Sequence, residues 1–368
     1  MVTEPQREED APSTVDIVGR DGSYPVYVEP GALARLSELI TRHVPGRRLA
    51  LLTDSNVRSL PARWGVALPA VDAELVVPAG EASKTREQWA RLSDTLLARR
   101  FGRDSALVLL GGGVVGDLGG FVAATLLRGI PYLQVPTTLL AMLDASVGGK
   151  TAVDTPHGKN LVGAFHPPSA VIADPRVLAT LPEREFRAGL SEAVKHGLIA
   201  DRAYFEWIAD SADRIGARDA DALAMLVRRS VEIKSAVVSE DERETGRRAT
   251  LNAGHTVAHA LEQASGYALA HGEAVAIGLV TECRLAESIG LAAPGLAAEV
   301  AALLAQLGLP TALPGFSPER LLECMAVDKK NRDSRIRFAL PVSIGAMAPG
   351  EGWTVAVLEP AIEDVLRR

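Results

Sequence analysis

Histidines gather in one short stretch of the chain, LNAGHTVAHALEQASGYALAHGEAVAIG, which holds three of the seven histidines: His255, His259 and His271. An acidic residue, Glu192, lies upstream in RAGLSEAVKHGLI. Two histidines and a carboxylate, with one coordination position open, are the usual ligands of a catalytic zinc ion. His255 and His259 share a helix face, but Thr256 stands where the H-E-x-x-H motif of metalloproteases has its glutamate. The residues predict a metal site and leave open which two histidines bind the ion.

A glycine-rich segment, SALVLLGGGVVGDLGGFVAATLLRG, has the pattern of a strand, a glycine turn and a helix. Gly111, Gly113 and Gly116 match G-x-G-x-x-G, in which glycines let the backbone approach a pyrophosphate at the positive end of a helix. The acidic residue expected about 20 residues later is missing, because YLQVPTT ends in threonines. Asp54, in LLTDSN, is the better ribose candidate. The pattern predicts an NAD site with a different strand order, and a metal beside it favours oxidation of an alcohol.

Basic and polar side chains concentrate in VPTTLLAMLDASVGGKTAVDTPHGKNLVGAF and in several later segments. The first segment carries Thr137, Thr138, Asp144, Lys150, Lys159 and Asn160 among glycines. The later cations are Lys195, Lys234, Arg248, Lys329 and Lys330. A chain of net charge -7 that collects cations in such segments is typical of a protein that binds a phosphate or a carboxylate. Interleaved apolar residues predict that the first segment is buried.

Composition limits the classes of function. A length of 368 residues suggests two domains, and the negative net charge disfavours nucleic acid or an anionic membrane as a partner. The two cysteines, Cys283 and Cys324, lie in apolar sequence of helical pattern and predict buried thiols rather than a disulfide. The N-terminal segment MVTEPQREEDAPST has no apolar stretch of the kind that signal peptides contain. We therefore expect a cytoplasmic protein.

Short strand-like runs alternate with helical patterns from about residue 15 to residue 181. Such alternation predicts an α/β domain with a Rossmann-like parallel sheet covered by helices. After LPEREFRAGL the chain is rich in alanine and leucine at helical spacing, with two short strand-like runs and a helix at its end. We expect a disordered tail over residues 1–14, an NAD-binding domain over 15–181 and a mainly α-helical, metal- and substrate-binding domain over 182–368. The two domains should enclose a cleft.

Several motifs together resemble the 3-dehydroquinate synthase family. They are GGGVVGDLGGFVAAT, RGIPYLQVPTTLLAMLDASVGGKTAVD, GKNLVGAFHPP, LPEREFRAGLSEAVKHG, LNAGHTVAHALE, HGEAVAIG and DKKN followed by IRFALP, in that family's order. This family belongs to the sugar-phosphate cyclases and is related to metal-dependent glycerol dehydrogenases. The resemblance implies a homodimeric lyase of the shikimate pathway that uses NAD and a divalent metal, zinc or cobalt. It would convert 3-deoxy-D-arabino-heptulosonate 7-phosphate to 3-dehydroquinate by transient oxidation, phosphate elimination, reduction and intramolecular aldol closure.

The resemblance also implies roles for individual residues. The metal ligands would be Glu192, His255 and His271, with His259 on the phosphate side. The NAD contacts would be Asp54, Asn56, Glu81, Lys84, Gly112, Gly113, Val114, Asp117, Thr137, Thr138, Asp144, Lys150, Lys159 and Thr180. The substrate contacts would be Asp144, Lys150, Asn160, Lys195, Lys234, Arg248, Asn252 and one of Lys329 and Lys330. Arg128 would reach the phosphate bound to the neighbouring subunit. Asp154 stands where many members have asparagine, a departure that would bear on substrate affinity and not on the assignment.

Three other functions fit parts of the sequence. A paralogous cyclase could make a cyclitol, an inosose or an aminated dehydroquinate, but the non-aminated substrates lack a carboxylate and should not need Lys234, Arg248 and Asn252 together. A metal-dependent polyol dehydrogenase would not need the cluster of phosphate-binding residues. An inactive NAD-binding scaffold protein would not need an intact set of metal ligands and lysines. The residues therefore favour a substrate that carries both a phosphate and a carboxylate.

Overall fold

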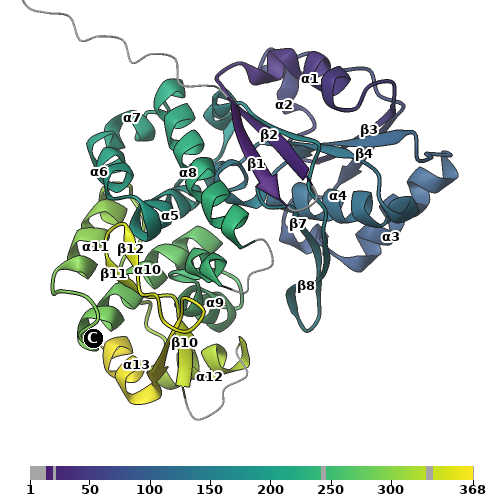
Figure 1. Cartoon of the computed structure of the whole chain (residues 1–368). Coiled ribbons are helices and arrows are strands. Elements are labelled where there is room, and N and C mark those ends of the chain that lie inside the picture. Colours follow the sequence, from purple (N-terminus) through teal and green to yellow (C-terminus); the bar gives the residue numbers. More distant parts are fainter. Residues whose placement is uncertain (1–13, 20–21, 242–245, 329–334, 368) are drawn as a thin grey trace, which may run out of the picture.

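The computed structural model of the chain describes residues 14–19, 22–241, 246–328 and 335–367. A sheet with its helices forms the first half of the chain, and a group of helices forms most of the second half (Figure 1). This confirms the predicted order of an α/β region followed by a mainly helical region. The predicted tail lies outside the described residues except for Thr14, which begins the first strand. No described helix is both long and apolar enough to cross a bilayer.

Seven strands form the main sheet, in the order β1-β2-β9-β6-β5-β3-β4. Their bounds are β1 Thr14–Gly19, β2 Gly22–Val28, β3 Arg48–Asp54, β4 Ala73–Val77, β5 Ser105–Gly111, β6 Tyr132–Pro136 and β9 Ala170–Ala173. β1 and β2 pair antiparallel, and every other neighbouring pair is parallel. The sequence predicts all seven strands because each is a short apolar or β-branched run between turn residues.

Helices cover both faces of this sheet. They are α1 Leu36–His43, α2 Leu60–Arg63, α3 Arg86–Ala98 and α4 Gly113–Thr125, with short helical turns η1 Ala32–Arg35, η2 Glu81–Ser83, η3 Leu126–Arg128, η4 Ala141–Ala145 and η5 Pro175–Thr180. Along β5, Val108 and Leu110 belong to the apolar core that includes α1, whereas Leu107 and Leu109 belong to a second core shared with α3 and α4. Because successive side chains of a strand point to opposite faces, this continuous apolar strand is buried on both sides.

The second half of the chain is built mainly from helices. They are α5 Glu183–Ala200, α6 Arg202–Asp210, α7 Ala212–Gly216, α8 Ala220–Glu240, η6 Arg247–Asn252, α9 His255–Ala264, α10 His271–Ser288, α11 Leu296–Gln306, α12 Pro318–Asp328 and α13 Glu359–Leu366. Two small sheets accompany them, β10 Arg335–Phe338 with β13 Val355–Leu358 and β11 Pro341–Ser343 with β12 Ala346–Met347. One apolar core extends from Val135 of the main sheet through Val194 of α5 to Val280 of α10. Both cysteines are buried and unpaired, as predicted.

The second half of the segment rich in predicted ligand-binding residues forms a two-stranded hairpin, β7 Lys150–Thr155 and β8 Gly158–Phe165. The strand β7 packs against α4, and its central residues are buried. On β8, however, Leu161 and Phe165 are 63% and 57% exposed. The prediction that apolar residues bury this segment is therefore wrong for β8. The hairpin extends away from the main sheet in Figure 1, so its outer strand has less protein to pack against.

Two glycines let α10 approach its neighbours until backbones touch. A Cβ atom on Gly272 would lie 1.9 Å from the carbonyl oxygen of Ala188 in α5. One on Gly278 would lie 2.0 Å from the carbonyl oxygen of Gly254, the residue before α9. Real Cβ atoms do not approach so closely, and interiors this tightly packed have no room for a methyl group. Three helices of the second half are thereby held at a short, fixed separation.

The strand order creates a point where the chain changes direction across the sheet. β3 lies between β4 and β5, so the connection after β3 leads to one side and the connection after β4 returns to the other. In open parallel sheets ligands bind beyond the carboxyl ends of the strands at such a point. Asp54 ends β3 and Gly112 follows β5. Both predicted nucleotide contacts therefore lie at this edge of the sheet.

Candidate active site

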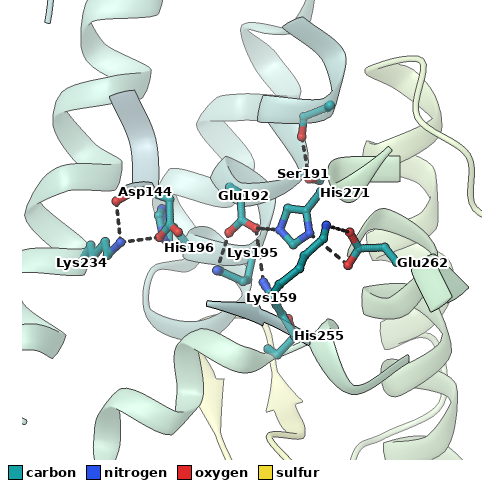
Figure 2. Close-up of polar contacts among 12 residues, drawn as sticks. Asp144, Lys159, Ser191, Glu192, Lys195, His196, Lys234, His255, Glu262 and His271 are labelled. Carbon is teal, nitrogen blue, oxygen red and sulfur yellow. Dashed lines mark hydrogen bonds and ion pairs between the residues drawn. The ribbon is translucent and has the colours of Figure 1, made fainter. Parts of the chain in front are cut away.

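Three helices bring Glu192, His255 and His271 together (Figure 2), and these three residues are called the metal trio below. Glu192 lies within α5, and the two histidines are the first residues of α9 and α10. Nε2 of each histidine lies 3.6 Å from Oε1 of Glu192. Two donor atoms bound to one tetrahedral zinc at about 2.1 Å lie about 3.4 Å apart. The spacing of these atoms therefore suits a single metal ion.

Oxygen atoms on the far side of each ring orient the two histidines. Nδ1 of His255 lies 3.1 Å from the carbonyl oxygen of Ala253, so Nδ1 carries the hydrogen atom. Nδ1 of His271 lies 3.4 Å from Oε2 of Glu262. Metal-binding histidines commonly donate their second N–H to a carbonyl or carboxylate in this way. In both rings Nε2 is the nitrogen that faces Glu192.

Burial and neighbouring charges set the protonation of the three side chains. Burial, assisted by the charge of Lys195, lowers the pKa of His255 to about 3, so its ring is neutral. Burial raises the pKa of Glu192, but Lys195 and the histidines lower it more, and the carboxylate stays charged. Burial also opposes protonation of His271, yet the carboxylates of Glu192 and Glu262 raise its pKa to about 9. A positive charge, supplied by a proton or by a metal ion, is therefore favoured between Nε2 of His271 and the carboxylate of Glu192.

The residues present fit a divalent metal. Oε1 of Glu192 is buried and accepts no hydrogen bond from any described residue. A buried carboxylate oxygen without a donor is unfavourable, and a metal ion would satisfy it. One carboxylate and two imidazoles form a donor set that suits zinc or cobalt and leaves a position for substrate.

A second group of charged side chains adjoins Glu192. Lys195 forms an ion pair with Oε2 of Glu192, and both side chains are almost completely buried. Lys234 of α8 lies 2.7 Å from Oδ1 of Asp144 in η4. Burial raises the pKa of Asp144, but the charges of Lys234 and Lys195 lower it overall. His196 is fully buried beside this group, and burial lowers its pKa to about 3. The group is therefore a neutral histidine among two ammonium groups and two carboxylates.

Arg248 is buried next to the loop that precedes β7. Its backbone N–H donates to Oδ2 of Asp241, 3.0 Å away, which shapes the start of η6. A Cβ atom on Gly148 would lie 2.8 Å from Nη2 of Arg248, so the absence of a side chain there makes room for the guanidinium. The charge of Arg248 also contributes to lowering the pKa of Lys234, although burial is the larger cause. Arg248 and Lys234 therefore contribute to one positive region.

The glycine turn after β5 has the features of a nucleotide cradle. Gly112 is extended, and Gly113 begins α4. A Cβ atom on Gly112 would lie 3.0 Å from Cγ2 of Thr138, so only glycine keeps this approach open. The hydroxyl of Thr137 is buried and has no hydrogen-bond partner within the described part of the chain. The free N–H groups at the start of α4 and this hydroxyl fit an anionic nucleotide.

The other predicted nucleotide contacts occupy loops at the same sheet edge. Oδ1 of Asp54 accepts hydrogen bonds from the N–H groups of Asn56 and Val57, which leaves Oδ2 for a ligand. Lys84 lies 2.5 Å from Asp117. Glu81 and Lys84 follow β4, Val114 and Asp117 lie in α4, and Thr180 ends η5.

The hairpin carries two predicted substrate contacts, Lys150 and Asn160, and one predicted NAD contact, Lys159. Lys150 begins β7 and is exposed. Asn160 is exposed, has a left-handed φ of 56°, and its N–H donates to Asp154. Lys159 lies 3.2 Å from Glu262 of α9. The hairpin therefore reaches His271 indirectly, through the pair of Lys159 and Glu262.

The remaining predicted residues have separate positions. His259 is exposed on α9, with its ring centroid 5.6 Å from that of His255. Asn252 ends η6. Arg128 is exposed at the end of η3. Lys329 and Lys330 lie outside the described residues.

The sequence reasoning missed two carboxylates that support the histidines. Glu262 contacts His271, and its position on α9 at i+7 from His255 and i+3 from His259 places it on their helix face. That spacing was a usable signal. Glu282 of α10 accepts hydrogen bonds from the N–H groups of Gly254 and Val257 at the start of α9. Nothing in the sequence marks Glu282, because its partners are backbone atoms of another helix.

Sequence comparisons agree with these features. A profile described as the 3-dehydroquinate synthase N-terminal domain matches residues 74–188, and one described as the C-terminal domain of that family matches residues 189–331. The 3-dehydroquinate synthase of Symbiobacterium thermophilum is 48% identical, over 88% of this chain and 92% of its own length. That of Rhodospirillum rubrum is 47% identical, over 88% and 87% respectively.

Solved structures share the fold. A 2-deoxy-scyllo-inosose synthase complexed with carbaglucose-6-phosphate, NAD⁺ and Co²⁺ superposes with a TM-score of 0.86 at 26% identity, covering 96% of this chain and 99% of its own. The 2-epi-5-epi-valiolone synthase of Streptomyces hygroscopicus subsp. jinggangensis, with NAD⁺ and Zn²⁺ bound, gives a TM-score of 0.81 at 28% identity, covering 100% and 98%. The two domain profiles and the relatives of nearly equal length show that this chain belongs to the 3-dehydroquinate synthase family.

Proposed function

We propose that this protein is a 3-dehydroquinate synthase that converts 3-deoxy-D-arabino-heptulosonate 7-phosphate to 3-dehydroquinate and phosphate. The observation that carries the proposal is the contact between the metal trio and the buried lysines. Lys195 pairs with Glu192, and the adjacent Lys234 pairs with Asp144. A site that combines metal ligands with cations suits an anionic polyol.

Glu192, His255 and His271 would hold the divalent metal, and the loops after β3, β4, β5 and β6 would hold NAD. When bound, these groups would supply Lewis-acid and hydride-transfer chemistry at one substrate hydroxyl. Structural neighbours that bind NAD⁺ together with Co²⁺ or Zn²⁺ support this assignment. The nucleotide would be recycled within each turnover, so the overall reaction is a phosphate-eliminating cyclisation.

The chain's own residues would bind and orient the substrate. Lys195, in contact with Glu192, is positioned to hold an oxygen close to the metal. Arg248, with Lys234 and Asn252, would bind the carboxylate, because a guanidinium can hold it bidentately. Lys150, Asn160 and His259 would bind the phosphate end. Binding the carboxylate and the phosphate at the same time would hold the flexible substrate in one conformer. Such positioning accelerates a reaction.

We also propose a homodimer in which Arg128 reaches the neighbouring subunit's site. Leu127 and Arg128 have φ angles of 52° and 69°, which non-glycine residues rarely adopt. Strain of this kind persists at functional positions more often than elsewhere. The strained turn exposes Arg128 rather than directing it into its own subunit.

Purified protein incubated with the heptulosonate phosphate, NAD and zinc should release phosphate and form 3-dehydroquinate with no net accumulation of NADH. Chelation should abolish turnover, and zinc or cobalt should restore it. Stoichiometric NADH would instead indicate a polyol dehydrogenase. Preference for a sugar phosphate without a carboxylate would indicate a cyclitol or inosose synthase.

A further inference from the structure

Glu262 is a buried carboxylate with two charged neighbours. Its side chain is 5% exposed, Oε2 lies 3.4 Å from Nδ1 of His271, and Oε1 lies 3.2 Å from Nζ of Lys159. Burial raises its pKa, but His271 and Lys159 lower it to about 2, so the carboxylate is charged. Figure 2 shows dashed lines from its carboxylate to the lysine and to the imidazole.

Contacts on both sides fix the orientation of His271. Nε2 faces Glu192, 3.6 Å away, while Nδ1 faces Glu262. The ring cannot rotate without losing a carboxylate neighbour at Nδ1. His255 receives the equivalent contact from a backbone carbonyl, which no side-chain replacement can remove. Of these two orienting contacts, the one on His271 is the one that depends on a side chain.

Lys159 reaches this carboxylate from the hairpin. Its ammonium group also lies 4.7 Å from the ring centroid of Tyr267, in the turn between α9 and α10. Gly266 and Tyr267 have φ angles of 62° and 63°, and for tyrosine this conformation is strained. The strained turn places an aromatic face beside the lysine. The outer strand of the hairpin is therefore attached to the turn that joins the two histidine-bearing helices.

We propose that Glu262 is a positioning residue that holds His271 for metal binding, and that Lys159 acts on the metal only through Glu262. The inference rests on the proposed metal site. A carboxylate at the second nitrogen fixes the tautomer and increases the basicity of the ligating nitrogen. Lys159 holds Glu262 against the imidazole, so the hairpin contributes to metal affinity without a ligand of its own.

The test measures metal affinity by competition with a chelator, without nucleotide, and the visible spectrum of the Co²⁺-loaded protein. Glu262→Gln should weaken zinc and cobalt binding about 10- to 100-fold, and Glu262→Ala at least as much. Both should change the cobalt spectrum. Lys159→Met should weaken binding in the wild-type background and have no further effect in the Glu262→Gln background.

Glu273→Gln is the matched control. Glu273 accepts a hydrogen bond from the N–H of Ala270 and pairs with Arg184, so it stabilises the start of α10 without touching the His271 ring. This variant should unfold at a lower temperature but bind metal within about twofold of wild type. Metal affinity and a cobalt spectrum unchanged in Glu262→Gln and Glu262→Ala would overturn the inference, as would additive effects of Lys159→Met and Glu262→Gln. Wild-type protein that binds no metal would instead overturn the proposed function.

Discussion

The ammonium group of Lys234 donates to Oδ1 of Asp144 at 2.7 Å and to the backbone carbonyl of the same residue at 2.6 Å. Lys234 belongs to α8, whereas Asp144 belongs to η4, the helical turn that follows β6 and the two threonines Thr137 and Thr138. A single lysine thus neutralises this carboxylate and anchors its backbone.

Lys234→Met should lower kcat/KM by about 30-fold or more, since truncating one partner of a buried charge pair costs about 2–5 kcal/mol in binding. Asp144→Asn should also lower kcat/KM, because it removes the other charge of the same pair. The double variant should lose less than the product of the two single losses, because the two residues act as a pair. Steady-state kinetics on all four proteins measures this, and strictly multiplicative losses would contradict the pairing.

Lys195→Met should destabilise the metal-free protein by about 3–5 kcal/mol, because Glu192 is then left charged and buried without its partner. Zinc should raise the unfolding temperature of this variant more than that of wild type, since the ion replaces the missing positive charge. Lys195→Arg retains the charge and is the control. An equal zinc shift in Lys195→Met and wild type would argue against a metal at Glu192.

Arg248→Lys should reduce the specificity constant about 10- to 150-fold, equivalent to about 1.5–3 kcal/mol. A lysine cannot bind a carboxylate bidentately. Metal and NAD content should not change. A substrate analogue without the carboxylate should be nearly indifferent to the substitution. If it is affected as strongly as the natural substrate, Arg248 binds another part of the molecule.

Gly112→Ala should weaken NAD binding about tenfold or more, because the new Cβ would lie 3.0 Å from Cγ2 of Thr138. Thr138→Ser removes that methyl group and keeps the hydroxyl. The double variant should therefore recover part of the affinity lost in Gly112→Ala. Titration of NAD by calorimetry measures this. Failure of Thr138→Ser to recover any affinity would show that the alanine blocks the nucleotide itself.

Asp201→Asn should lower stability by about 1 kcal/mol at neutral pH. Asp201 caps α6 through the N–H of Tyr204 and accepts hydrogen bonds from Arg229 of α8 at 2.6 and 2.8 Å. Burial raises its pKa, but these contacts lower it overall. A carboxyl group with a lowered folded-state pKa stabilises the protein above the unfolded pKa of about 3.9 and loses that effect as pH falls through the folded value. Urea unfolding should show the two proteins converging below about pH 4; a constant difference would contradict the assignment.

Local patterns were sufficient to predict the elements that form the sheet. β5 is buried on both faces, and its sequence is a continuous apolar run that ends in glycine. The hairpin was not predicted, because its glycines and charged residues resemble a loop. Its strands pair with each other rather than with the main sheet. Strand formation there depends on packing of β7 against α4, which no local pattern records.

The metal trio was predictable in part. Spacing marked the histidines but could not choose among them, and only the resemblance to a family separated His259 from the pair. In the structure His259 is exposed on α9, while His271 comes from the next helix. Which rings converge depends on how α9 and α10 pack, and this is a tertiary property.

The close contacts of Gly272 and Gly278 mean that the spacing of the three proposed metal ligands is set partly by residues that have no side chain. A methyl group at Gly272 would push the helix that begins with His271 away from α5, which carries Glu192, and one at Gly278 would push it away from the start of α9, where His255 lies. Displacements of even a fraction of an ångström would change which ions the three donors accommodate. In a mutational scan for activity these two positions would score like ligands, although a hydrogen atom is all that they contribute.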